Sequence, residues 1–333
     1  MGSTPLKLVL AYVLLAFTAS TLAAPDTAHA FCRTTTSPAP IDYDPSVSGC
    51  WPHGLPVYWA NACVSFNVQK SASQQISYED ATTEIAAAFA TWTATTCDNG
   101  GGHVSISVTD LGPVECDIVE YNQNGPNQHV FVFRDEDWPY DDSSNTLALT
   151  TLSYDNTTGE IYDADVEINT HNQTLSTSST LPPGGYDFLS VVTHEAGHFL
   201  GLAHATETTS TMYAHYTPGT TWMRKLTSDD EAGICNIYPP DGSRDVTFAD
   251  GGTTTVAEGE CDPTPEHGFT SLCTDQLPAT PARTSCAATA RTGGNGDAWG
   301  ELALWGIVVA AALSRRTRAA NAHVPAAHGR GRA

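Results

Sequence analysis

The stretch that decides the fold is HEAGHFLGLAH, residues 194–204. On a helix, His194 and His198 lie one turn apart and face the same side, so both imidazoles can reach one metal ion. Gly201 can adopt the positive φ that ends a helix and turns the chain, which brings His204 back as a third ligand. Three neutral imidazoles and one open position are typical of a catalytic zinc site. The pattern therefore predicts one Zn²⁺ ion held by the three histidines.

Glu195, directly after the first histidine, is predicted to be the catalytic base. Two histidines already serve the metal on this side of the helix, so the carboxylate is placed to accept a proton from the water beside the metal. Zinc lowers the pKa of a bound water to about 7 and polarises a carbonyl oxygen. The predicted chemistry is hydrolysis of a peptide bond without a covalent intermediate.

Apolar periodicity predicts two more helices and several strands around the motif, which itself lies in a helix predicted over residues 186–203. Residues 77–95 carry an apolar stripe at helical spacing behind the N-cap Ser77. Residues 228–238 carry three acidic residues in their first turn behind a Thr227 or Ser228 cap, which suits the positive end of a helix dipole. Strands are predicted at residues 55–68, 103–109, 129–133, 148–154 and 161–169, the last two as a hairpin.

The motif resembles the zinc signature of metzincin metallopeptidases, and two further matches are similar to the matrixin, or matrix-metalloprotease-like, branch. Residues 210–213 (STMY) resemble the Met-turn, in which Met212 would lie beneath the zinc, and residues 226–239 resemble the closing helix. The likeness covers about residues 51–240. It implies an α+β fold of the metzincin, zincin-like type, with a twisted, mostly parallel sheet, a long active-site helix and a C-terminal helix.

One strand departs from the family pattern. The resemblance implies a structural zinc held by histidines and an aspartate, but the matching strand reads DADVEIN (163–169), and Glu167 stands where a zinc-binding histidine is expected. A second zinc is therefore not predicted. Asp163, Asp165 and Glu167 favour a hard cation such as Ca²⁺. A solvated strand edge in an acidic protein accounts for them equally well.

Both ends of the chain carry targeting patterns. Residues 1–30 read as a secretory signal peptide, with Lys7, an apolar run and an Ala-x-Ala cleavage site at residues 28–30. Near the other end, Cys286 and a Gly-rich spacer precede the apolar run 302–313 and three arginines. This order resembles the C-terminal sorting tails of exported myxobacterial proteins. We expect a secreted or cell-surface protein, with any membrane or surface attachment made through the C-terminal segment.

Composition limits the kinds of partner that the chain can bind and helps to divide it into parts. The 37 acidic and 14 basic residues give a net charge of −23, which argues against a nucleic-acid partner. Nine cysteines without a CxxC pair predict disulfides with at least one cysteine left over. The predicted parts are the signal peptide (1–30), an N-terminal segment (31–50), the matrixin-like block (51–240), a Thr/Gly/Pro-rich linker or disulfide-tied stalk (241–298), an apolar helix with arginines (299–318) and a tail (319–333).

Two functions compete for this pattern. The first is an exported zinc endopeptidase that acts on proteins or peptides as a monomer. The second is a surface adhesin, a binding module that keeps the metzincin fold without activity. Such degenerate members usually lose the glutamate or a ligand, whereas this chain retains Glu195 and all three histidines. The sequence therefore favours the peptidase.

Overall fold

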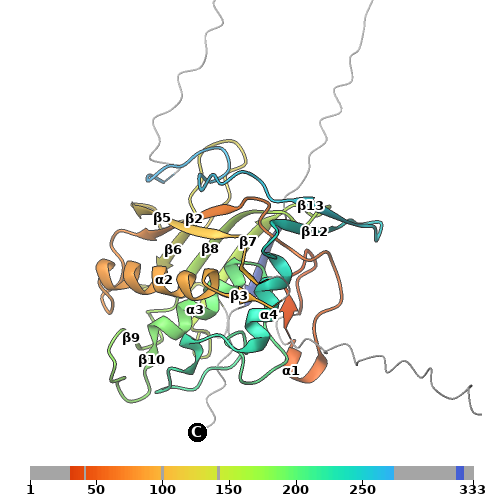
Figure 1. The fold of residues 1–333 in the computed structure, drawn as a ribbon. Helices are drawn as coiled ribbons and strands as arrows, with labels where there is room; N and C mark the ends of the chain where they lie inside the picture. The colour runs from red at the N-terminus through yellow and green to blue at the C-terminus, as the bar shows by residue number, and fades with distance from the viewer. Residues whose placement is uncertain (1–30, 41–42, 99–100, 141–142, 274–319, 326–333) are drawn as a thin grey trace, which may run out of the picture.

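The centre of the molecule is a mixed, mostly parallel sheet (Figure 1). The computed structural model describes residues 31–40, 43–98, 101–140, 143–273 and 320–325. Within them the sheet has the order β14-β7-β8-β6-β2-β5. Its strands are β2 (Cys63–Gln69), β5 (Ser107–Val114), β6 (Val130–Phe133), β7 (Ala148–Tyr154), β8 (Ile161–Ile168) and β14 (Ala320–Pro325). Neighbours from β5 to β8 pair in parallel, β7 is antiparallel to β8, and β14 is antiparallel to β7.

Helices α2 (Tyr78–Thr93) and α3 (Phe188–Phe199) cover one face of this sheet (Figure 1). The apolar stripe of α2 is buried against the strands, and Phe89 stacks on Phe66 with ring centroids 5.2 Å apart. Burial of each such side chain contributes about 1.5–3 kcal/mol relative to leaving it exposed. The indole nitrogen of Trp92 donates to the carbonyl of Thr193 at 2.8 Å, which joins the two helices. The active-site helix is therefore held between the sheet and α2.

The ends of the predicted helices follow local chemistry. Ser77 caps α2, and α4 (Ser228–Ile237) begins with a capping box between Thr227 and Asp230, so both helices are confirmed. The helix predicted over 186–203 is shorter. Its predicted ends form the two-residue strands β10 (Tyr186–Asp187) and β11 (Leu202–Ala203), because Asp187 caps the helix and Gly201 turns the chain. The remaining short elements are β1 (Cys32–Arg33), α1 (Pro45–Ser48), β3 (Thr96–Cys97), β4 (Gly102–His103), β9 (Leu175–Ser176) and η1 (Trp222–Arg224).

The hairpin of β7 and β8 is confirmed, but two predicted strands begin later than expected. Residues 55–62 run as an irregular, largely buried segment before β2. The strand predicted at 103–109 pairs with β2 only from Ser107 onward. The alternation of apolar residues therefore predicted buried residues better than it predicted strand pairing, since residues in irregular segments can also be buried.

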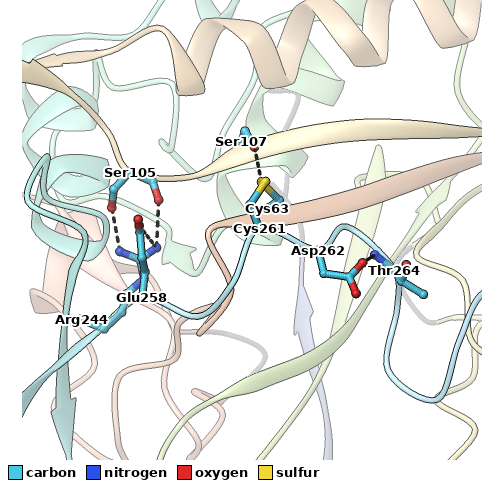
Figure 2. Close-up of a disulfide and its surroundings, with 8 residues drawn as sticks. All are labelled: Cys63, Ser105, Ser107, Arg244, Glu258, Cys261, Asp262 and Thr264. Carbon is cyan, nitrogen blue, oxygen red and sulfur yellow. Dashed lines mark hydrogen bonds and ion pairs between the residues drawn. A yellow bond between two sulfur atoms is a disulfide. The ribbon is translucent and has the colours of Figure 1, made fainter.

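Residues 243–273 attach to the sheet instead of leaving it as a linker. The hairpin of β12 (Ser243–Thr247) and β13 (Thr253–Ala257) inserts the fully buried Arg244. Figure 2 shows the guanidinium of Arg244 between Ser105 and Glu258: it donates to the Ser105 hydroxyl and carbonyl at 2.7 and 3.0 Å and lies 3.4 Å from the Glu258 carboxylate. Of the two alternatives predicted from residue 241, the free linker is wrong as far as Cys273, whereas the disulfide tie is present. These residues lack apolar periodicity because cysteines and one arginine, not an apolar stripe, attach them to the sheet.

Four disulfides close the fold: Cys32–Cys50, Cys63–Cys261, Cys97–Cys235 and Cys116–Cys273. They pair eight of the nine cysteines, and the ninth, Cys286, lies outside the described residues. Disulfides bind Cys261 to β2 and Cys273 to the loop after β5, and the chain segment that carries them lies on the side of the sheet opposite the helices (Figure 1). The disulfide Cys32–Cys50 closes the N-terminal segment.

The predicted signal peptide and the apolar run 302–313 also lie outside the described residues. Among the residues that are described, none of the helices has the length and apolar character that crossing a bilayer requires.

Candidate active site

Helix α3 positions two histidines and the glutamate from a firmly capped start. The carboxylate of Asp187 accepts from the backbone N–H of Ser190 at 2.9 Å, and it also accepts from Arg224 Nε at 2.7 Å. Six residues separate this cap from His194, where the HEAGH sequence begins, and the helix is buried along most of its length. A capped and ion-paired start fixes the rotation of the helix, and with it the direction of every side chain that follows.

The two helical histidines are set as metal ligands by their backbone partners. Nδ1 of His194 lies 2.7 Å from the carbonyl of Thr211, and Nδ1 of His198 lies 2.9 Å from the carbonyl of Leu202. Because a carbonyl can only accept, each Nδ1 carries the proton and each Nε2 presents a lone pair. Burial lowers the pKa of His194 to about 4, and burial with the neighbouring His194 lowers that of His198 to about 3. Both rings are therefore neutral at pH 7.

The Nε2 atoms of these two rings face each other at 3.1 Å in the protein interior. Two buried lone pairs at this distance repel unless a cation lies between or beside them, so the pair fits a metal ion. The third histidine completes the group: the ligand atoms of His194, His198 and His204 all lie within 4.8 Å of one another. Within the described ranges of the chain, these are the residues found grouped closely enough to hold a metal.

Gly201 makes this third ligand available. Its φ is +98°, a conformation that L side chains rarely adopt, and a Cβ there would lie 3.0 Å from the carbonyl oxygen of Val57. After the turn, β11 pairs with β1, and the hydroxyl of Thr34 donates to the Leu202 carbonyl that also receives His198. The turn predicted from the sequence is confirmed, and a strand from the N-terminal segment holds it.

Glu195 is buried in the same cluster and has a partner that sequence reasoning missed. The hydroxyl of Thr150, on β7, donates to one of its carboxylate oxygens at 2.6 Å. Burial raises the pKa of Glu195 to about 8, and this hydrogen bond opposes the rise. A carboxylate in such a site holds a proton more readily than one in water, which suits a group that must accept a proton and return it. No local pattern links Thr150 to Glu195, because 45 residues separate them.

The Met-turn lies beneath the histidines, and Asp230 anchors it. This buried carboxylate accepts from the backbone N–H of Thr211 at 2.9 Å and of Met212 at 3.2 Å, and from the hydroxyl of Ser210. The sulfur of Met212 approaches Gly197 so closely that a Cβ there would lie 2.3 Å away. Met212 therefore packs against the turn of α3 between His194 and His198. Gly197 and Asp230 are site residues that the sequence marked only as a variable motif position and a helix-capping acid.

The acidic strand β8 does not form the expected cation site. Asp163, Asp165 and Glu167 are all buried, so the alternative of a solvated strand edge is wrong. Glu167 is engaged by Arg134 Nη2 at 2.6 Å and by the Tyr140 hydroxyl. Burial raises the pKa of Asp163 to about 7 and that of Asp165 well above its usual value. In the described part of the chain the three carboxylates do not meet at one point, so we do not propose calcium there.

Comparison with known proteins agrees with this geometry. The Matrixin (Peptidase_M10) family matches residues 58–239, more than half of the chain. The fold and the three-histidine site thus define the class, that of the metallopeptidases. Within that class, the chain belongs to the matrixin family.

Several individual proteins are similar over shorter stretches. Human matrilysin is 31% identical over 103 residues, which are 31% of this chain and 35% of matrilysin. Human matrix metalloproteinase-20 is 27% identical over 137 residues, 41% of this chain and 25% of that protein. Metalloendoproteinase 1-MMP of Arabidopsis thaliana is 44% identical over 54 residues, 16% and 15% of the two chains. The chain thus spans at most about a third of the length of these relatives.

Proposed function

We propose that this chain is an exported zinc-dependent endopeptidase that hydrolyses peptide bonds of proteins. One observation carries the proposal: the buried Glu195 carboxylate stands beside three histidines whose ligand atoms converge on one point. A structural metal site does not require a base that is not itself a ligand, whereas a metal-dependent hydrolase does.

The chain's own residues have distinct parts in this reaction. His194, His198 and His204 would hold the zinc, which when bound polarises the scissile carbonyl and acidifies a water molecule. Glu195 accepts the proton of the attacking water and returns it to the leaving amine, so no bond forms between enzyme and substrate. Thr150 fixes one oxygen of Glu195 at 2.6 Å and keeps the carboxylate in one orientation. Since Thr150 lies on β7, a peptide extended along this strand passes the base.

Export is the second part of the proposal. The signal-peptide pattern of residues 1–30 and the four disulfides both suit an oxidising compartment outside the cytoplasm. The strongly acidic composition is compatible with this location, and it disfavours a nucleic-acid partner.

The proposal is tested with purified protein that begins at Phe31. Loaded with zinc, it should cleave an unfolded protein such as casein at internal bonds. A chelator such as 1,10-phenanthroline should abolish cleavage, and added zinc should restore it, because the lost ion supplies the Lewis acid. Mass spectrometry of the fragments checks that the cuts are internal. A protein that binds one zinc and cleaves nothing would instead be the adhesin.

The C-terminal residues bear on this activity. Strand β14 pairs with the edge of β7, and Val324 lies opposite Thr150, the partner of Glu195. We propose that residues 286–318 form a sorting signal and that processing near Cys286 removes β14 together with it. A chain that ends at residue 319 should therefore show a several-fold lower KM for peptides and an unchanged kcat, since a tethered competitor is gone. Equal KM values for the two chains, or exported protein that keeps peptides from 302–333, would contradict this account.

A further inference from the structure

A pocket lies beside the metal site, on the side of the third histidine. His204 and Ala203 form one of its walls, and the N-terminal segment from Cys32 to Trp51 forms the others. The cavity between the walls has a volume of about 70 Å³, several times the space that one water molecule needs, so a single side chain can enter it. Because a zinc ligand lines the pocket, any group inside it lies next to the reacting bond.

The N-terminal part of this pocket is a closed and braced loop. The disulfide Cys32–Cys50 joins its ends. Inside the loop, Trp51 Nε1 donates to the carbonyl of Ser37 at 2.8 Å, and the rings of Tyr43 and Trp51 meet edge to face at 5.0 Å. At its base, β1 pairs with β11 immediately before His204. The pocket is therefore formed before any ligand arrives, which lowers the entropy cost of binding.

The walls favour an apolar guest. Trp51, Tyr43 and the prolines at 38, 40 and 45 are among the lining residues, and the Tyr43 hydroxyl donates to the carbonyl of Gly49 at 2.8 Å. Arg33 also lines the pocket, but its guanidinium donates to the carbonyl of Val57 at 2.7 Å. None of the described lining residues is acidic, so a cationic side chain in the pocket would lack a counter-charge.

The direction in which a substrate would lie along β7 brings the residues before its scissile bond toward this pocket. Strand β14 shows how an extended chain lies on β7: it runs antiparallel, from Tyr154 toward Leu149. A substrate in this direction passes Thr150 and Glu195 at its scissile bond, so its preceding residues lie toward Tyr154. The hydroxyl of Tyr154 donates to the carbonyl of Thr36, in the N-terminal loop. The residues before the scissile bond therefore approach the pocket.

We propose that the described part of this loop, residues 32–40 and 43–51, forms a specificity subsite for a bulky apolar side chain within the three residues that precede the scissile bond. This inference rests on the proposed peptidase function and names the substrate class of the same site. Trp51 is its main specificity-determining residue, and Ala39 lies in its wall.

Hydrolysis and binding test the subsite separately. Peptides that carry Phe in turn at each of the three positions before the scissile bond are compared with the same peptides carrying Ala. At one position the parent enzyme should prefer Phe by about 10-fold or more in kcat/KM, the usual effect of filling an apolar pocket. Trp51→Ala should reduce this preference to near one, because it lowers kcat/KM for the Phe peptide more than for the matching Ala peptide. Ala39→Phe, which fills the pocket and keeps Trp51, should do the same.

The controls separate this role from a structural one. Val47→Ala changes an exposed apolar residue of the same loop outside the pocket, and its Phe preference should equal that of the parent. A loop that merely supports the fold would lower hydrolysis of Phe and Ala peptides equally. The same peptides are also titrated by fluorescence anisotropy against zinc-loaded Glu195→Gln, with and without Trp51→Ala. If no peptide is hydrolysed, a Phe preference in binding still supports the subsite. An unchanged Phe-to-Ala ratio in both variants overturns it.

Discussion

Replacing Glu195 with Gln should reduce kcat by roughly 10²–10⁴-fold, the contribution that a positioned general base typically makes. The amide has nearly the same shape as the carboxylate, and its oxygen can still accept the hydroxyl of Thr150. The fold and the zinc content should therefore stay unchanged, while the group that accepts the proton is lost. Initial rates of peptide hydrolysis, with zinc measured by mass spectrometry in the same samples, give both quantities.

The matched control is Glu207→Gln, which makes the same chemical change at an exposed glutamate after the motif. It should hydrolyse peptides at the parent rate. Thr150→Val supplies an intermediate case: it leaves the base in place and removes the hydrogen bond that orients it, so kcat should fall by less than in Glu195→Gln. Near-normal turnover in Glu195→Gln would refute the assigned role of this residue.

Replacing His204 with Ala should weaken zinc binding by at least about 100-fold, since even losing a partner behind a ligand costs about 10–100-fold in metal affinity. His194 and His198 keep their backbone partners at Thr211 and Leu202, but two imidazoles leave the metal with half of a tetrahedral set. Hydrolysis should fall together with the zinc content. Competition with a chromophoric chelator measures the affinity without reference to activity.

His53→Ala, at an exposed histidine of the N-terminal segment, is the control and should bind zinc like the parent. Excess zinc should partly restore hydrolysis in His204→Ala, since the base remains in place. One tightly bound zinc per chain in His204→Ala would show that the ligand set is not the three histidines of the motif.

The metal site could be predicted because its geometry is local. Three of its four functional residues lie within one helical turn and a half, and the fourth follows a glycine whose φ of +98° matches the turn that the motif requires. Helix periodicity and the freedom of glycine fix these relations whatever surrounds them. The caps at Ser77 and Thr227 were readable for the same reason, since each involves a contact three residues away.

Strand β8, with its three acidic residues, shows where prediction from local residue spacing fails. The spacing of Asp163, Asp165 and Glu167 indicates one face of a strand, but it cannot say what covers that face. The structure buries all three and gives Glu167 to Arg134, a partner 33 residues earlier. Whether an acidic face meets water, a cation or an arginine depends on elements distant in sequence, and strand alternation holds no information about them.

By itself, then, the sequence predicted the three-histidine group, the candidate base, the capped starts of α2 and α4 and the β7–β8 hairpin, because each follows from contacts between near neighbours in the chain. Only the tertiary structure decided that Thr150 orients Glu195, that Asp230 anchors the Met-turn, and that Cys63 pairs with Cys261 across 198 residues. It also decided that the N-terminal loop stands beside His204. These contacts join segments that meet only when the sheet closes around a common core, and no local spacing records which segments will meet.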